Sequence, residues 1–219
     1  MGEMGSFGYA ATPATGADAP GILVIQEWWG LMPHIKNVAD RFAAEGFVAL
    51  APDLYRGAST TEPDEAAKMM MALDLDAASN QLDHAIAELQ RRTGRTHIGV
   101  VGFCMGGGLA YKVACDRPDA VKALAPFYGV IPWPAAAPDY SRLSAAVQGH
   151  YAADDDSAPP DVVESLEEQL RALGKDCVMF VYPDTAHAFF NDDRPEVHDA
   201  KASALAFSRT VAHFRAHLS

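Results

Sequence analysis

Short apolar runs alternate with amphipathic stretches along most of the chain. The apolar runs are nearly continuous, which is typical of strands that are buried on both faces of a parallel sheet. The stretches between them have the pattern of helices, and several begin at a proline, which suits the first turn of a helix. We therefore predict strands at residues 21–26, 47–51, 98–103, 121–128, 145–151 and 178–182, and helices at residues 33–45, 63–73, 76–92, 106–117, 159–173 and 196–217.

This alternation of strands and helices predicts an α/β fold, a doubly wound and mostly parallel sheet with right-handed crossovers and helices on both faces. In such a sheet, functional side chains gather beyond the carboxyl ends of the strands. Residues 5–11 leave room for edge strands, and the proline-rich segment 131–138 is expected to form a surface loop or a lip over the site. Because 219 residues suffice for one good core and are few for two, we expect a single domain, residues 1–219.

The composition narrows the range of partners and compartments. A net charge of −12, with no local cluster of Lys and Arg, opposes binding to nucleic acids or anionic membranes. No apolar stretch approaches the roughly 20 residues that a membrane helix needs, and the N-terminus has no pattern of a secretory signal. The three cysteines fit neither a disulfide framework nor a metal site. We therefore expect a cytoplasmic protein, a monomer by default, whose partner is a small molecule.

The segment Gly102–Gly106, Gly-Phe-Cys-Met-Gly, lies between a predicted buried strand and a predicted helix. In that context it is typical of a nucleophile elbow with cysteine as the central residue. The glycines let strand and helix approach closely, while Cys104 is held in a strained conformation with its side chain in a cleft. The positive end of the helix dipole favours the thiolate. We expect Cys104 to be a nucleophile, and the alternative is a buried structural cysteine.

A cysteine nucleophile needs a base, and the base needs an acid that orients it. His187 follows the last predicted strand, and Asp154, Asp155 and Asp156 follow the strand before it. The order nucleophile, acid, histidine is that of α/β-hydrolases, so we choose His187 as the base, with a plain surface histidine as the alternative, and Asp155 as the acid. At least two of the three acids are expected only to form a turn and a helix cap. The histidines expected on the surface are His34, His84, His97, His198, His213 and His217.

Glu27 follows the first long strand and is expected on the same side of the sheet as the elbow. A carboxylate beside a thiol can accept its proton or hold it until substrate arrives. The backbone N–H groups of Trp28 and Met105 are then candidates for an oxyanion hole. Aromatic residues expected to line an apolar pocket, although they fit the core equally well, are Trp29, Phe103, Tyr128, Trp133, Phe189 and Phe190.

Five motifs are spread over residues 20 to 190: Gln-Glu-Trp-Trp-Gly at 26–30, Ala-Pro-Asp-Leu-Tyr at 51–55, Gly-Val-Val-Gly-Phe-Cys-Met-Gly-Gly at 99–107, Phe-Tyr-Gly-Val at 127–130 and Ala-His-Ala-Phe at 186–189. Together they resemble the dienelactone hydrolase (carboxymethylenebutenolidase) family of the α/β-hydrolase superfamily. The resemblance implies an esterase or lactonase that works through a thioester and needs no metal or organic cofactor. It also implies Cys104, Asp155 and His187 as the triad, Glu27 as the carboxylate that controls the thiol, and Trp28 and Met105 as oxyanion donors.

The chain departs from this family where substrate binding is concerned. Members that act on dienelactone hold its carboxylate with two arginines, and by alignment those positions are Pro63 and Asn191 here. Arg56 and Arg194 are near in sequence but do not match the motif positions. Loss of a bidentate Arg–carboxylate contact costs energy and orientation. We therefore expect a neutral ester or lactone, not dienelactone itself, with Asn191 among the pocket residues.

Two other functions fit parts of the sequence. One is a thiol enzyme or redox sensor of the flavodoxin-like type, in which an elbow cysteine lies beside a glutamate, as Cys104 and Glu27 would. The late Asp155 and His187 argue against it. The other is a binding protein that kept the hydrolase fold and lost the chemistry. Ester turnover that depends on Cys104 separates the hydrolase from both.

Overall fold

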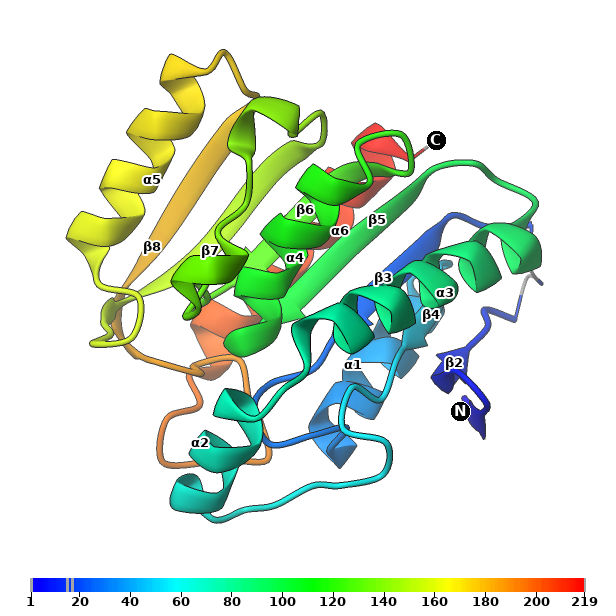
Figure 1. The fold of residues 1–219 in the computed structure, drawn as a ribbon, viewed down its shortest axis with the longest axis horizontal. Helices are drawn as coiled ribbons and strands as arrows, with labels where there is room; N and C mark the ends of the chain where they lie inside the picture. Colours follow the sequence, from blue (N-terminus) through cyan, green and yellow to red (C-terminus); the bar gives the residue numbers. More distant parts are fainter. Residues whose placement is uncertain (1, 15, 17, 219) are drawn as a thin grey trace.

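The computed structural model describes residues 2–14, 16 and 18–218, in which eight strands form one sheet with the order β1-β2-β4-β3-β5-β6-β7-β8 (Figure 1). The pairs β1–β2 and β2–β4 are antiparallel, and all other pairs are parallel. This mixed, mostly parallel sheet confirms the predicted fold class. Met1, Thr15, Ala17 and Ser219 of the expected domain lie outside the described residues. The strands are β1 (Glu3–Gly5), β2 (Gly8–Ala11), β3 (Gly21–Ile25), β4 (Val48–Ala51), β5 (Ile98–Phe103), β6 (Val121–Phe127), β7 (Ala146–Asp154) and β8 (Cys177–Ala186).

The helices begin close to the predicted residues and have the expected starting signals. Pro33 and Pro63 open two of them, and the carboxylates of Asp74 and Asp199 cap two others by accepting backbone N–H groups. In the described part of the chain no helix is long and apolar enough to cross a bilayer. The helices are α1 (Pro33–Ala44), α2 (Pro63–Met71), α3 (Leu75–Thr93), α4 (Met105–Asp116), α5 (Pro160–Ala172) and α6 (Ala200–His217).

Two apolar layers cover the two faces of the sheet. Side chains such as Val100 and Leu109 pack with α3, α4 and α5 on one face. Neighbouring residues of the same strands, such as Val101, pack with α1 and α6 on the other, where Phe42 and Phe214 are buried. Each fully buried apolar side chain of this kind contributes about 1.5–3 kcal/mol to folding. The helices α3, α4 and α5 run along one face in Figure 1, and α2 lies beyond the carboxyl ends of the strands.

Two regions differ from the predictions. The last strand was predicted to be fully buried, but β8 is the outer edge of the sheet, so Val181 is 43% exposed. The last helix begins at Ala200, four residues later than predicted, because the chain after His187 first forms a series of turns. The proline-rich segment 131–138 contains a short 3-10 helix, η1 (Pro134–Ala136), and another, η2 (Tyr140–Arg142), follows it.

Candidate active site

Cys104 lies at a sharp turn between β5 and α4, with φ 54° and ψ −119°. Its backbone N–H donates to the carbonyl oxygen of Phe127 at 3.0 Å. The strand and helix approach so closely that a Cβ on Gly102 would lie 2.0 Å from the carbonyl oxygen of Gly106. A positive φ in a residue other than glycine is costly and is found where the surrounding structure enforces it. The turn leaves the thiol half-buried at the N-terminus of a 12-residue helix.

Asp155 and His187 come from the ends of neighbouring strands, β7 and β8. The imidazole Nδ1 of His187 donates to Asp155 Oδ2 at 2.8 Å. The other carboxylate oxygen of Asp155 accepts from the backbone N–H groups of Ser157 and Ala158, at 2.8 and 3.1 Å. Asp155 is 5% exposed, whereas its two acidic neighbours along the chain are exposed. Of the three acids, Asp155 is therefore the one in contact with His187.

The two partners have shifted pKa values. Burial by itself raises the pKa of Asp155, but the hydrogen bond and charge of His187 and the two backbone N–H groups outweigh burial and lower it. Burial by itself lowers the pKa of His187, but the hydrogen bonds and charges of Asp155 and Cys104 outweigh it and raise this pKa to about 10. Because Nδ1 faces Asp155, Nε2 is the nitrogen that faces the Cys104 sulfur. The imidazole of His187 therefore lies between the Asp155 carboxylate and the Cys104 sulfur.

Glu27 follows β3 and is buried, at 2% exposure. Its Oε2 accepts from Asn191 Nδ2 at 2.7 Å, and its Oε1 accepts from the Tyr128 hydroxyl at 3.3 Å. Asn191 was predicted to line the substrate pocket in place of an arginine. In the structure its amide instead holds the Glu27 carboxylate, so both oxygens of this buried acid have a donor.

Tyr128 contacts both this carboxylate and the imidazole of His187. It directly follows β6 with φ 36°, and its backbone N–H donates to the carbonyl oxygen of His150 at 2.7 Å. Its ring meets the ring of His187 edge to face, with centroids 5.2 Å apart. Burial raises the pKa of Tyr128 well above its ordinary value, and the charges of Glu27 and Cys104 raise it further. The phenol therefore lies within electrostatic range of both the acid and the thiol.

A cavity of about 270 Å³ opens over Cys104. The sulfur, the imidazole of His187 and the Tyr128 ring share its wall with several apolar groups, and no Lys or Arg is among the residues lining it. Arg56 lines a different cavity, and Arg194 pairs with Glu196 at 2.9 Å. The residues that line the cavity over Cys104 are Trp28, Met70, Cys104, Met105, Tyr128, Gly129, Val130, Pro132, Ser157 and His187.

The backbone N–H groups of Trp28 and Met105 were predicted to bind an oxyanion. Both residues line the cavity over Cys104. Met105 is the first residue of α4, so its N–H has no acceptor within the helix. Trp28 lies in the turn that follows β3, next to Glu27. An oxygen bound in this cavity can therefore approach both residues from the side of the sulfur.

Several aromatic residues predicted for the pocket belong elsewhere. Phe103, Phe189 and Phe190 are 0–1% exposed and pack in the layer of α1 and α6, where the rings of Phe103 and Phe190 stack with centroids 5.4 Å apart. Trp133 packs in the opposite apolar layer. Trp29 lines a neighbouring cavity together with Asn191. Of the predicted aromatic set, Tyr128 alone lines the cavity over Cys104.

Two histidines expected on the surface are buried. His34 is 1% exposed, and its Nδ1 bonds to Asp192 Oδ1 at 2.7 Å. His213 is 8% exposed and bonds through Nε2 to the carbonyl oxygen of Ala146 at 3.1 Å. Each has a polar partner far away along the chain, which the sequence pattern does not reveal. In the described residues, no group of three or more His, Cys, Asp and Glu side chains is arranged to hold a metal ion.

The prediction from sequence missed five residues of the cavity wall: Met70, Gly129, Val130, Pro132 and Ser157. Val130 and Pro132 lie in or next to the proline-rich segment that was expected to form a lip, and Ser157 follows Asp155 by two residues. Closeness in sequence to the predicted lip and to Asp155 could have identified these three residues. Met70 lies on α2, and only the tertiary structure places that helix over the site.

Comparisons with known proteins identify the family of the chain. The family model described as the dienelactone hydrolase family matches residues 7–218. The chain is similar to protein usf of Aquifex pyrophilus, at 35% identity over all of both chains. It is also similar to an Aquifex aeolicus (strain VF5) protein provisionally named a carboxymethylenebutenolidase, at 32% identity over all of both chains. A solved structure provisionally named a dienelactone hydrolase, from Klebsiella pneumoniae, superposes with a TM-score of 0.83 at 29% identity and covers 94% of this chain and 91% of that one.

Proposed function

Because the chain belongs to the dienelactone hydrolase family, a family of carboxylic ester hydrolases, we propose that it hydrolyses a small neutral ester or lactone with Cys104 as the nucleophile. The observation that carries this proposal is the hydrogen bond of 2.8 Å between His187 and the buried Asp155, beside a strained cysteine that opens into a cavity. A nucleophile, a base and a group that orients the base are the minimum for covalent catalysis of acyl transfer.

In the first half of the reaction, His187 takes the proton of the Cys104 thiol and the sulfur attacks the carbonyl carbon of the ester. The negative charge that develops on the carbonyl oxygen is stabilised by the N–H groups of Trp28 and Met105. When the tetrahedral intermediate collapses, the C–O bond breaks and His187 gives its proton to the departing oxygen. The products are an alcohol and a thioester on Cys104.

In the second half, water replaces the alcohol beside His187. The imidazole takes a proton from the water, the hydroxyl attacks the thioester carbon, and the C–S bond breaks to release the acid. The proton returns to Cys104. Asp155 holds the imidazole in one orientation and stabilises its charged form in both halves. The net reaction consumes one water for each ester.

Glu27 is proposed to act on Cys104 indirectly, through the residues that bond to its carboxylate. Both of its oxygens already have donors, from Asn191 and Tyr128, so its negative charge is fixed in position. Tyr128, which donates to Glu27, lines the cavity beside Cys104. Glu27 and Tyr128 therefore hold this side of the cavity in place next to the nucleophile until a carbonyl group occupies it.

The electrostatics of the cavity support a neutral substrate. The lining residues include no Lys or Arg, and two carboxylates, Glu27 and Asp155, lie behind the wall. An anionic substrate would meet these charges without a compensating Arg or Lys. This supports an uncharged ester or lactone over dienelactone, whose carboxylate needs a cationic partner.

The test is hydrolysis of p-nitrophenyl acetate, simple lactones and dienelactone by the wild type, Cys104→Ala and Cys115→Ala. We expect Cys104→Ala to lose at least about 10³-fold in kcat/KM on esters. Cys115 is a buried cysteine whose pKa is raised by burial to about 12, so Cys115→Ala should retain activity and serves as the matched control. Ester turnover that survives in Cys104→Ala would refute the mechanism. No turnover by any variant, with Cys104 still alkylated by iodoacetamide, would favour a redox or binding role.

A further inference from the structure

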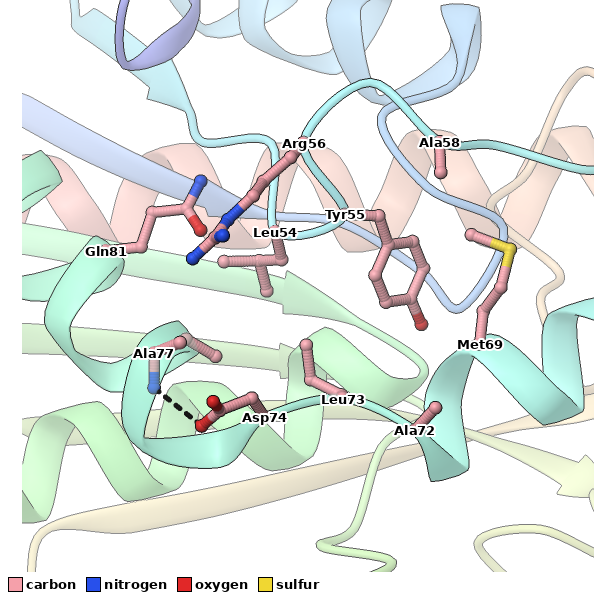
Figure 2. Close-up of a pocket in the computed structure, with 11 residues that line it drawn as sticks. Leu54, Tyr55, Arg56, Ala58, Met69, Ala72, Leu73, Asp74, Ala77 and Gln81 are labelled. Carbon is pink, nitrogen blue, oxygen red and sulfur yellow. Dashed lines mark hydrogen bonds between the residues drawn. The ribbon is translucent and has the colours of Figure 1, made fainter.

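A second cavity of about 270 Å³ lies beside the catalytic cavity, between the segment that follows β4 and the junction of α2 and α3 (Figure 2). Its wall is mostly apolar and includes Leu54, Met69 and Leu73. Besides Tyr55, three polar side chains line this wall: Asp74 caps Ala77 at 3.0 Å, the amide of Gln81 donates to a backbone carbonyl, and Arg56 is solvent-exposed. The mechanism proposed above does not use this cavity.

Tyr55 forms the partition between the two cavities. Its ring lines the second cavity, where Figure 2 shows it facing Met69. Its hydroxyl donates to the sulfur of Met105 at 3.3 Å, and Met105 lines the catalytic cavity. Burial raises the pKa of Tyr55, and the charge of Cys104 raises it further, which places the phenol within electrostatic range of the nucleophile.

The helix α2 contributes to both cavities through consecutive residues. Met69 lines the second cavity, and Met70 lines the catalytic one. Methionine has three rotatable bonds and adapts its shape to what it contacts. Ala66 is the buried residue of this helix, and Met71 is 67% exposed, so α2 is anchored lightly. A partition made of Tyr55 and Met70 can therefore move without a change in the sheet.

The proposed reaction determines where the two parts of the ester lie in the cavity. We call these parts the alcohol arm and the acyl arm. His187 must give a proton to the departing oxygen, so the alcohol arm lies beside His187. The acyl arm is attached to the carbonyl carbon at Cys104 and must occupy the rest of the cavity, whose wall includes Met70 and Met105. Those are the residues next to the partition. An acyl arm too long for the catalytic cavity therefore meets Tyr55 and Met70.

We propose that the second cavity is the acyl-chain site of this hydrolase: it takes the apolar end of a longer acyl group, with Tyr55 and Met70 as the movable partition. This inference rests on the function proposed above and adds the substrate class, esters of medium-length, uncharged carboxylic acids. The two cavities together fall within the roughly 300–1,000 Å³ of ordinary small-molecule sites.

The test compares p-nitrophenyl acetate with p-nitrophenyl octanoate in the wild type and in Ala77→Phe, which fills the second cavity from α3. We expect the ratio of kcat/KM for octanoate over acetate to fall at least tenfold in Ala77→Phe. The control is Asn80→Phe, an exposed position of the same helix outside the cavity lining, which should leave the ratio unchanged. Ala72→Phe fills the cavity from the end of α2 and serves as a second variant should Ala77→Phe not fold.

Octyl acetate tests the direction of the arms, because it carries its long chain on the alcohol. Ala77→Phe should leave its hydrolysis unchanged, and a tenfold loss on octyl acetate instead of on the octanoate ester would overturn the assignment to the acyl arm. An unchanged octanoate ratio in both filling variants, with Cys104-dependent hydrolysis of acetate intact, would overturn the acyl-chain site and leave the proposed function standing. Absence of Cys104-dependent turnover on every ester would overturn both.

Discussion

His150 lies within β7 and His187 directly follows β8, the strand that pairs with β7, yet the protein surrounds the two histidines differently. His150 is fully buried, and both of its nitrogens are bonded within the protein. Its Nδ1 accepts from the Tyr182 hydroxyl at 2.9 Å, and its Nε2 donates to Thr210 Oγ1 at 3.0 Å. Arg209 donates to the same Tyr182 hydroxyl at 3.2 Å, so the chain of donors runs in one direction and holds His150 in one neutral tautomer.

His187 has one nitrogen fixed by a carboxylate and the other turned to Cys104 and the cavity. Its side chain is 26% exposed. The carboxylate raises its pKa, whereas burial and the charges of Arg209 and His213 lower the pKa of His150 well below 6.5. The comparison shows what separates a structural histidine from a chemical one in this fold: a partner that favours the charged form, and one ring nitrogen that the protein leaves open to a ligand.

The largest effect should come from substituting each of the two histidines separately. His187→Gln is expected to lower kcat/KM on esters by about 10⁴-fold or more, because the base is lost. This loss of activity is expected in the folded protein. His150→Leu leaves the Tyr182 hydroxyl without its acceptor and should cost about 1–3 kcal/mol of unfolding free energy.

Steady-state kinetics and urea unfolding of both variants measure this contrast. The folded His150→Leu protein should keep activity within a fewfold of the wild type. A His150 variant that loses activity without losing stability would show that the two networks are coupled, and would remove the distinction.

A second test separates Asp155 from its neighbour in the same loop. Asp155→Asn keeps an acceptor for the N–H groups of Ser157 and Ala158 but removes the charge that supports the imidazolium, so kcat should fall by about 10²–10⁴-fold. Asp156→Asn changes an exposed acid and should have little effect. Equal losses in the two variants would mean that the loop as a whole, and not Asp155, sets the rate.

The smallest effects concern pH. His213 has its pKa lowered to about 4 by burial and by the charge of His217. A base with a lowered pKa binds protons more readily when unfolded, so its contribution to stability is present above pH 6.5 and is lost as the pH falls towards 4. The acid loss should be on the order of 3 kcal/mol. His187 has a raised pKa, so its contribution is present below pH 6.5 and is lost as the pH rises through about 10.

Unfolding free energies measured between pH 4 and pH 10 check both directions. In His213→Gln, the decrease of the unfolding free energy towards acid pH should become less steep. In His187→Gln, the decrease towards alkaline pH should become less steep. His84→Gln, at an exposed position of α3, is the control. If the unfolding free energy of His213→Gln still decreases towards acid pH as steeply as that of the wild type, other groups cause the loss, and His150 is the next candidate.

Much of the architecture follows from the amino-acid pattern alone. The elements from residue 21 onwards were predicted to within a few residues, because buried strands and amphipathic helices have different periods and the prolines mark helix starts. The elbow around Cys104 was recognisable because a turn this tight between strand and helix requires glycine at defined positions. The order of Cys104, Asp155 and His187 along the chain is likewise a property of the sequence.

What each functional side chain touches was decided by the tertiary structure. Periodicity tells that Phe103 and Phe190 face an apolar layer, but not that this layer lies on the far side of the sheet from the thiol. Asn191 and Glu27 meet across 164 positions of sequence, and no local pattern encodes that contact. The sequence by itself determined which groups stand at the carboxyl ends of the strands, because that depends on local periods and turns. Only the packing of distant elements decided which of them share a cavity, since burial and long-range hydrogen bonds depend on residues that the local pattern does not contain.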